Sequence, residues 1–343
     1  MIDRPRHASA LLVLTLTVPL YATDVHVRVS PDVKTGIDST TEFPTIQNAL
    51  DHHPFATPNP DGTAGRVFIE IAPGTYRERI IVTQNHQNIT FLGTGKTPDE
   101  VVITNSLNAK QAGGTFFTET AEINGDGFEA DNLTFENTAG NTGQAVAAAV
   151  RADRAVFKNV RFLGHQDTLF ADAGRQYYVD SYIEGGVDYI FGDATAVFDR
   201  CELHSNGPGA ITAQSRTRAD ETTGYVILNS KVTATLDHSG PKPLAITLGR
   251  PWRAYARTVF INTELPADLN PLGFTKWSHR ESETTAWYGE ANSTGPGATP
   301  ELLAQRSDWA HKLTAAEIKS FQPVPFLSGK DHWNPITEAA KLP

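Results

Sequence analysis

The segment FKNVRF at residues 157–162 is followed by YVDSYI at residues 178–183 and by FDRCEL at residues 198–203. Related segments are NITF at 88–91, NLTF at 132–135 and ILNSKV at 227–232. The polar residues that align in these six segments are Asn88, Asn132, Asn159, Asp180, Arg200 and Asn229. Taken in order, they are 44, 27, 21, 20 and 29 positions apart. Such steps match one or two turns of a solenoid with roughly 20 to 22 residues per turn, some of them lengthened by loops.

Two solenoid architectures compete for this pattern, the leucine-rich repeat and the parallel β-helix. The repeated segments are short, rich in Val, Ile, Phe and Thr, and separated by Gly, Asn and Asp, which is typical of strands and turns. Leucine patterning is poor, and no amphipathic segment of helix length lies between repeats. We therefore predict an all-β parallel β-helix in which the aligned Asn residues occupy turns and tolerate left-handed backbone geometry. Cys201 aligns with Val160 and is predicted to be a core residue.

Both ends of the solenoid are predicted to carry short capping helices, because terminal coils expose strand edges. Residues 43–50 place Ile46 and Leu50 on one helical face. Near the other end, Thr314 and Glu317 have the spacing of a helix capping box. Residues 293–300 read as a loop before this final cap. No linker rich in Pro and Ser divides the chain, so residues 23–343 are predicted to form one domain.

The N-terminus is typical of an export signal. Arg4 and Arg6 precede an apolar run from Leu11 to Leu20 that is short for a membrane span, and small residues follow at Ala22 and Thr23. The alternative is a buried first strand. We expect residues 1–22 to be a cleaved signal peptide and the protein to be secreted or periplasmic.

Charge and cysteine content exclude several classes of partner. The net charge of the 343-residue chain is −10 without a dense Lys/Arg block, so we expect no nucleic-acid or membrane partner. An acidic sugar polymer must therefore meet local cations or arrive esterified. The single cysteine precludes an intramolecular disulfide. We expect a monomer.

A set of acids and amides shares the spacing of the coils. Asp167 and Asp188 are 21 residues apart, and Gln144 and Gln166 are 22 apart. Residues at equivalent positions on neighbouring coils lie about 4.8 Å apart, so the four side chains should form a column. Arg250 follows Asp188 by 62 residues, close to three further turns, and its guanidinium could hold the Asp188 carboxylate ionised. The alternative is that both aspartates only cap turns.

These motifs, in this order, closely resemble the pectin methylesterase family, of the microbial type without an inhibitory pro-region. The resemblance covers nearly the whole chain after residue 22 and rests on residues 74–78, 125–128, 137–140, 144–147, 166–169, 188–192, 211–216, 248–252, 288–290 and 295–297. It implies a right-handed parallel β-helix and a pectinesterase that demethylates polygalacturonate without a cofactor or a metal. Glu119 and His165 depart from the family pattern, at positions that bear on pattern preference.

The resemblance also implies roles for matching residues. Asp188 resembles the nucleophile and Asp167 the general acid that later acts as base, while Gln166 and Gln144 resemble oxyanion donors and Arg250 the partner of Asp188. The positions that resemble the substrate groove are Thr115, Phe170, Phe191, Trp252 and Trp277. For Phe170 and Phe191, core packing is the competing interpretation.

Other chemistries fit the sequence less well. The chain has no Gly-x-Ser-x-Gly elbow and no paired Cys/His spacing, which disfavours a serine triad or a zinc site. Three alternatives remain open. They are an esterase or thioesterase for a different ester, a lyase or glycosidase on a β-helix, and a non-catalytic wall-binding β-helix.

Overall fold

The computed structural model describes residues 24–34, 41–53, 56, 65–239, 245–278 and 281–343. The predicted signal peptide, residues 1–22, lies outside these ranges. No helix in the described part of the chain is long and apolar enough to cross a membrane.

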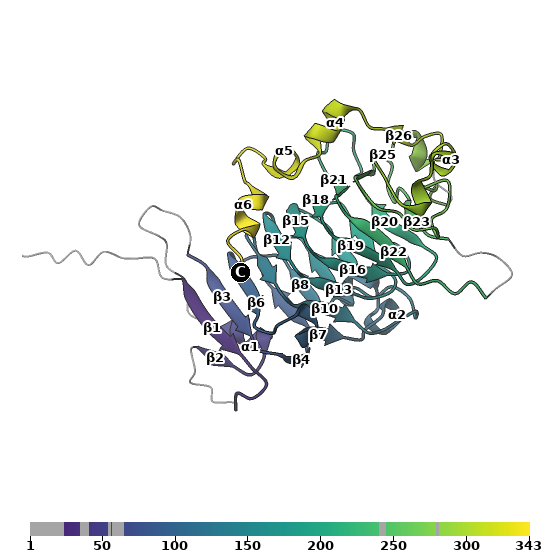
Figure 1. The fold of residues 1–343 in the computed structure, drawn as a ribbon. Helices are drawn as coiled ribbons and strands as arrows, with labels where there is room; N and C mark the ends of the chain where they lie inside the picture. Colours follow the sequence, from purple (N-terminus) through teal and green to yellow (C-terminus); the bar gives the residue numbers. More distant parts are fainter. Residues whose placement is uncertain (1–23, 35–40, 54–55, 57–64, 240–244, 279–280) are drawn as a thin grey trace, which may run out of the picture.

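The chain winds into a right-handed parallel β-helix in which successive coils add one strand to each of three sheets (Figure 1). Sheet I contains, in spatial order, β2 (Glu42–Phe43), β1 (Val25–Val29), β3 (Val67–Ile71), β6 (Ile89–Gly93), β9 (Glu129–Asp131), β12 (Ala155–Lys158), β15 (Arg175–Val179), β18 (Thr195–Asp199), β21 (Gly224–Leu228), β24 (Arg257–Ile261), β25 (Trp287–Ala291) and β26 (His311–Lys312). Sheet II contains β4 (Gly74–Arg77), β7 (Val101–Asn105), β10 (Thr134–Asn137), β13 (Arg161–Leu163), β16 (Tyr182–Gly185), β19 (Glu202–Ser205) and β22 (Lys231–Ala234). Sheet III contains β5 (Ile80–Val82), β8 (Ala121–Ile123), β11 (Ala148–Val150), β14 (Leu169–Ala171), β17 (Ile190–Gly192), β20 (Ala210–Gln214) and β23 (Thr247–Gly249). The predicted fold class is confirmed.

The repeated apolar positions stack inside the coil. The rings of Phe157 and Tyr178 lie 4.8 Å apart and nearly parallel, and the rings of Tyr178 and Phe198 lie 4.6 Å apart. These spacings equal the distance between neighbouring strands, so each coil adds one ring to the stack. Cys201 is buried among the same core residues, and burial raises the pKa of its thiol to about 12. The prediction that it is a core residue is confirmed.

A row of left-handed residues forms the corner between sheets I and II. Asn159 and Asp180 both have φ of 51°, and the other members of the row are Asn132, Arg200, Asn229, Asn262 and Asn292. Where neighbouring coils both carry asparagine, the amides bond from coil to coil, since Nδ2 of Asn159 donates to Oδ1 of Asn132 at 3.0 Å. Asn262 repeats this contact with Asn229 at 2.9 Å. The predicted turn role is confirmed, and the ladder extends two coils beyond the segments found in the sequence.

The placement of Asn88 in this repeat was wrong. Asn88 precedes β6, whereas Asn132 follows β9, and these strands are neighbours with Phe91 opposite Ala130. Asn88 therefore lies at the corner between sheets III and I, although its φ of 54° is also left-handed. An Asn suits a left-handed turn at either corner, so its identity does not reveal which corner it occupies.

Helices form at both ends. At the start, α1 (Ile46–His52) is capped by Thr45 and buries Ile46, Ala49 and Leu50. In the first part of the molecule the chain also forms α2 (Ala109–Ala112), η1 (Pro98–Glu100) and η2 (Thr115–Phe117). Residues 293–300, predicted to be a loop, include η4 (Pro296–Ala298), and α3 (Pro300–Leu303) starts at their last residue. The remaining short helix is η3 (Ser282–Thr284).

The C-terminal helices cover a face of the solenoid. Helix α4 (Ala315–Ser320) has the predicted capping box between Thr314 and Glu317. It is followed by α5 (Pro323–Leu327) and α6 (Pro335–Ala339), which run back along the outer face of sheet I (Figure 1). The residues that join them to the sheet are Val156, Tyr177, Val179, Val197, Val226, Leu228, Val259, Ile261, Phe321, Leu327, Trp333, Ala339 and Leu342. Because these helices cover that face, both faces of its central strands are buried.

Candidate active site

The predicted column of amides and acids forms at the corner where sheet II passes into sheet III. Gln144 pairs with Gln166 in parallel register, and Gln166 pairs with Val187. Asp167 therefore lies opposite Asp188 on the next coil. The backbone extends the column, since Asp167 N–H donates to the Val187 carbonyl at 3.1 Å and Asp188 N–H donates to the Ala210 carbonyl at 2.7 Å.

Both aspartates adopt left-handed backbone geometry. Asp167 has φ of 64° and Asp188 has φ of 47°. Aspartate tolerates this conformation better than most residues because its short side chain can bond locally. The turn-capping interpretation is therefore correct for the backbone, and the environment of the side chains decides whether the acids also do chemistry.

Arg250 meets Asp188 through a bidentate ion pair. Its Nε donates to Oδ1 at 2.9 Å and its Nη2 to Oδ2 at 2.6 Å. Arg250 follows β23, and in sheet III only β20 separates β23 from β17, which follows Asp188. The arginine is thus two coils away, and the expected three were wrong. Long connections between β20 and β21 and between β22 and β23 account for the additional residues.

The two carboxyls have unequal electrostatic environments. The pKa of Asp167 is raised to about 8, chiefly by burial and then by the nearby Asp188 charge, and Arg250 opposes part of this rise. Burial also raises the pKa of Asp188, but the hydrogen bonds and charge of Arg250 oppose that rise directly. The first proton to leave the pair therefore comes from Asp188, and Asp167 keeps its proton near neutrality.

A cavity of about 290 Å³ opens beside these groups. It is lined by Thr115, Phe116, Gln144, Gln166, Asp167, Asp188, Phe191, Ala213, Arg250, Trp252 and Trp277. The guanidinium carbon of Arg250 lies 4.3 Å from the centre of the Trp277 ring, so the tryptophan also holds the arginine. The structure thus brings together nine of the ten residues that the sequence selected.

Phe170 is the residue that does not line the cavity. Its side chain is buried, and its ring stacks on Phe191 with centroids 4.5 Å apart. Phe170 also contacts Phe116 at 5.0 Å between centroids. It supports Phe116 and Phe191, two of the aromatic residues that line the cavity, which favours the packing interpretation for Phe170.

Two lining residues were missed in the sequence. Ala213 lies opposite Phe191 on the next strand, and their separation of 22 residues, the same as between the two glutamines, could have revealed it. Phe116 has a weaker signal, a pair of adjacent phenylalanines in a polar segment. Both rings are exposed, Phe116 by 46% and Phe117 by 59%.

His165 and Glu119, the two residues that depart from the family pattern, contact residues outside the cavity. His165 Nδ1 lies 2.8 Å from Oδ1 of Asn206. Glu119 is 1% exposed and forms ion pairs with Arg79 at 3.4 Å and Arg151 at 3.9 Å. Neither side chain lines the cavity.

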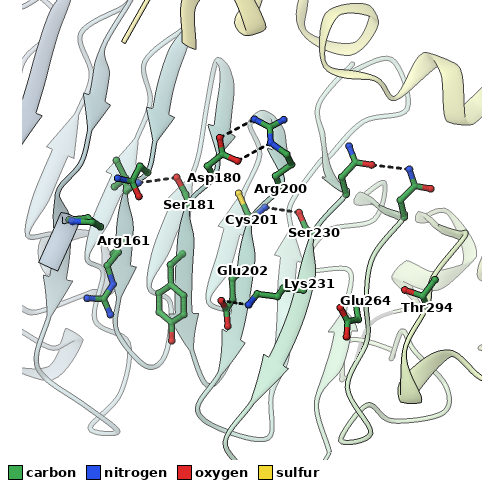
Figure 2. A pocket seen from close by; sticks show the side chains of 16 residues that line it. Arg161, Asp180, Ser181, Arg200, Cys201, Glu202, Ser230, Lys231, Glu264 and Thr294 are labelled. Carbon is green, nitrogen blue, oxygen red and sulfur yellow. Dashed lines mark hydrogen bonds and ion pairs between the residues drawn. The ribbon is translucent and has the colours of Figure 1, made fainter. Parts of the chain in front are cut away.

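A larger hollow, of about 760 Å³, follows the corner between sheets I and II (Figure 2). Figure 2 shows Arg200 bonded to Asp180 and Lys231 bonded to Glu202 within this hollow. Its acids and bases neutralise one another, and its asparagines bond to their neighbours in the ladder. Size therefore does not identify the reactive site, whereas the uneven acid pair does.

Comparison with known proteins assigns the family. A family model described as Pectinesterase matches residues 32–330. The chain belongs to the pectinesterase family. Pectinesterase 1 of Citrus sinensis is 36% identical to it over 308 residues, which cover 88% of this chain and 51% of the citrus protein. The chain thus spans about half the length of this relative.

Solved pectin methylesterases share the architecture. The pectin methylesterase from carrot is 33% identical with a TM-score of 0.80, and the match covers 92% of this chain and 97% of the carrot chain. A pectin methylesterase in complex with hexasaccharide VII is 27% identical with a TM-score of 0.70, covering 92% and 99% of the two chains. The fold of this pectinesterase-family chain is therefore shared along almost its whole described length.

Proposed function

We propose that the protein is a carboxylic ester hydrolase that demethylates methyl-esterified homogalacturonan (pectin), releasing pectate and methanol. The observation that carries this proposal is the uneven acid pair, in which Arg250 clamps Asp188 while Asp167 has a pKa of about 8. The pair supplies an ionised nucleophile and a protonated acid at the same pH. Cleaving a methyl ester requires both.

In the first half of the reaction, a carboxylate oxygen of Asp188 attacks the methyl-ester carbonyl. The negative charge that develops on the carbonyl oxygen is stabilised by the side-chain amides of Gln144 and Gln166, which line the same cavity. Asp167 gives its proton to the departing methoxide, which leaves as methanol. The product of this half is a mixed anhydride between Asp188 and the sugar carboxyl group.

In the second half, Asp167 acts as a base. Its carboxylate takes a proton from a water molecule, and the resulting hydroxide attacks the anhydride carbonyl. Asp188 leaves as a carboxylate that Arg250 again clamps, and the sugar carries a carboxylic acid, which ionises and releases its proton to the solvent. Asp167 recovers the proton that the next cycle needs.

The aromatic lining supports a sugar substrate. Trp252, Trp277 and Phe116 present rings at the cavity, and aromatic faces suit the apolar C–H faces of pyranose rings. The related pectin methylesterase in complex with a hexasaccharide supports the same class of substrate. A neutral methyl ester also avoids the repulsion that a free carboxylate would meet beside Asp188.

Methanol release from highly methylated pectin by the purified protein tests this function. Release that continues after dialysis against EDTA is expected, because the residues described complete the reaction with carboxylates and amides alone. Release of unsaturated or reducing sugar ends in place of methanol would favour a lyase or glycosidase. Hydrolysis of other esters but not of pectin would favour the same chemistry on a different substrate. Binding of pectin without turnover would favour a non-catalytic wall-binding protein.

The organisation of the chain is also proposed. Residues 1–22 are assigned as an export signal, so the mature protein begins near Thr23 and is secreted or periplasmic. Residues 23–343 are assigned to one catalytic domain, the microbial layout, with no part of that range serving as an inhibitory pro-region. The enzyme is assigned as a monomer. N-terminal sequencing of exported protein and light scattering test these assignments.

A further inference from the structure

A third hollow, of about 400 Å³, lies on the sheet I side of the molecule near its C-terminal end. It opens between the connection after β20, the segment before β24, strand β25 and helix α4. Its lining residues are Arg216, Ala219, Tyr255, Arg257, Thr285, Trp287, Glu317, Ser320 and Phe321. The charge of this lining is unusual for a protein with a net charge of −10, because it holds two arginines and one acid.

The two arginines bond to backbone carbonyls and not to carboxylates. Nε of Arg216 donates to the Arg218 carbonyl at 2.9 Å, and Nη2 to the carbonyl of Ala219. Nε of Arg257 donates to the Thr223 carbonyl at 3.0 Å, and Nη2 to the carbonyl of Thr222. Among the described residues, no carboxylate lies within ion-pair distance of either guanidinium group. Each therefore keeps N–H donors for another acceptor.

Arg257 has no carboxylate partner among the described residues, although its guanidinium carbon lies 5.5 Å from the centre of the Phe326 ring. The pKa of Arg257 is lowered to about 10, chiefly by burial and in part by the neighbouring positive charge of Arg216. By contrast, the half-buried Arg175 is bonded to the carboxylates of Asp153 and Asp331. A buried cation without a counter-ion is costly, and a bound anion would remove that cost.

Glu317 is the one acid of the hollow. Its Oε2 accepts hydrogen bonds from the backbone N–H of Thr314 at 2.7 Å and from the Thr314 hydroxyl at 2.8 Å. These bonds hold its carboxylate at the start of α4, as the second half of the capping box. Glu317 therefore bonds to the start of the helix and not to the two arginines, whose remaining donors can meet a ligand.

An aromatic platform lies beside the cations. Trp287 is directly opposite Arg257 in the pairing of β24 with β25, so the two side chains leave the same face of sheet I. The Trp287 ring stacks on His311 at 5.0 Å and contacts Phe321 at 5.4 Å, which fixes its orientation. Tyr255 completes an aromatic wall. Cations beside aromatic faces suit a ligand that carries both a carboxylate and a sugar ring.

We propose that this hollow binds a de-esterified galacturonate unit, with its carboxylate between Arg216 and Arg257 and its ring against Trp287. The inference rests on the proposed function, whose product is such a unit. One segment connects the two sites, because Trp252 of the catalytic cavity is bonded through its N–H to the Gln214 carbonyl at 3.1 Å, and Tyr255 to the Arg216 carbonyl at 3.1 Å. The enzyme would thereby hold demethylated chain away from the acid pair, which repels it.

Calorimetric titration with unmethylated trigalacturonate tests the proposal. Arg216→Gln should weaken binding at this site by roughly tenfold or more, because it removes charge-assisted hydrogen bonds to a carboxylate. The matched control is Arg218→Gln, an arginine in the same connection that pairs with Asp220 and Glu221 and lies outside the hollow. Equal affinity and stoichiometry in the two variants and the parent would overturn the proposal.

Since Arg216 also holds backbone carbonyls, a second variant separates ligand binding from loop structure. Trp287→Ala makes no change in that connection and should also weaken trigalacturonate binding. If only Arg216→Gln has an effect, the arginine acts as a clamp on the chain and the proposal fails. In an Asp188→Asn background, which prevents its hydrolysis, fully methyl-esterified trigalacturonate should bind all variants alike. Acetate that competes as well as trigalacturonate would contradict a site for a uronic acid.

The outcome is independent of catalysis. Trigalacturonate binding requires no turnover, so a protein that releases no methanol but shows the Arg216 and Trp287 effects would refute the proposed function and support this site. Methanol release together with identical trigalacturonate binding in all variants would support the proposed function and refute this site.

Discussion

Two corners of the β-helix have the same backbone conformation but different roles. At the corner between sheets I and II, residues such as Asn159 and Asp180 have φ near 51°. At the corner between sheets II and III, Asp167 and Asp188 have φ of 64° and 47°. The local turn is alike, so its geometry does not distinguish a structural residue from a reactive one.

The corners differ in what the side chains meet. In the first corner, polar groups satisfy one another along the coil, as in the contact between Asn159 and Asn132. Asp180 there is exposed and meets Arg200 through two hydrogen bonds. In the second corner the two acids are side by side and share one strong partner, Arg250, which bonds to Asp188. Left-handed Asp residues become reactive where burial and unequal pairing leave one of them protonated.

The largest expected effect compares an aspartate from each corner. Asp188→Asn keeps the size and the tolerated left-handed backbone but removes the nucleophile, so kcat should fall by roughly 10⁵-fold or more, the scale of losing a covalent nucleophile. Asp180→Asn is the matched control, with the same substitution at the same kind of turn. It should change methanol release by less than about twofold, because surface ion pairs contribute little. Circular dichroism should show both variants folded, and near-parental turnover by Asp188→Asn would disprove its assigned role.

Asp167→Asn should cost about 10²- to 10⁴-fold in kcat, the usual contribution of a general acid and base. In the parent enzyme, the raised pKa keeps Asp167 protonated below about pH 8, so ester cleavage should decline as pH rises through about 8. On the acid side, activity should decline when Asp188 becomes protonated. A pH–rate profile of methanol release measures both limbs, and in Asp167→Asn the alkaline limb should be absent.

The same substitution should stabilise the fold in a pH-dependent way. Because the folded pKa of Asp167 lies above its unfolded value, the stability associated with this group is present below pH 4 and is lost as pH rises toward about 8. Asparagine does not titrate, so the Tm of Asp167→Asn relative to the parent should rise between pH 4 and pH 8. A Tm difference that stays constant over this range would show that Asp167 is not the group with the raised pKa.

Arg250→Lys should have a smaller effect that is visible in the shape of the profile. Lysine keeps the charge but loses the planar fork that bonds both oxygens of Asp188, which should cost about 10- to 100-fold in kcat/KM. The proton of the pair is then less firmly assigned to Asp167, so the limbs of the pH–rate profile should move. A profile that is merely scaled down would mean that Arg250 does not set the order of ionisation.

The repeat and the acid column could be predicted from the sequence because both depend on residues that recur at the coil period. Arg250 was selected as the partner of Asp188 because residues 248–252 offer a cation, not because its spacing matches that period. The sequence could not place Asn88, since a left-handed Asn fits more than one corner. The sequence also overestimated the number of coils between Asp188 and Arg250, because the number of residues between them does not show which belong to loops and which to coils.

Lateral packing was the other element that the sequence left open. The capping box of Thr314 and Glu317 predicted α4 correctly, but nothing local shows that α5 and α6 run back along sheet I. Phe170 was grouped with the substrate groove because its position resembles a groove position of the family, and the packing of its ring on Phe191 became visible only in the structure. Short helices and stacked rings take their positions from tertiary contacts, which a single-sequence pattern does not contain.

The smallest expected effect tests only the corner between sheets I and II, which carries the asparagine ladder. Asn159→Gly keeps the left-handed backbone but removes the amide that bonds to Asn132, whereas Asn159→Ala removes the amide and also places a Cβ at an unfavourable φ. A left-handed L-residue costs about 1 to 2 kcal/mol, so Ala should be less stable than Gly by about that amount, even though Gly has more unfolded-state entropy to lose. Chemical denaturation of the two variants measures the difference. Methanol release per folded molecule should match the parent in both, because the ladder lies on the other side of sheet II from the acid pair. A kcat that falls together with stability would mean that the two corners are coupled and that the ladder helps to set the geometry of Asp167 and Asp188.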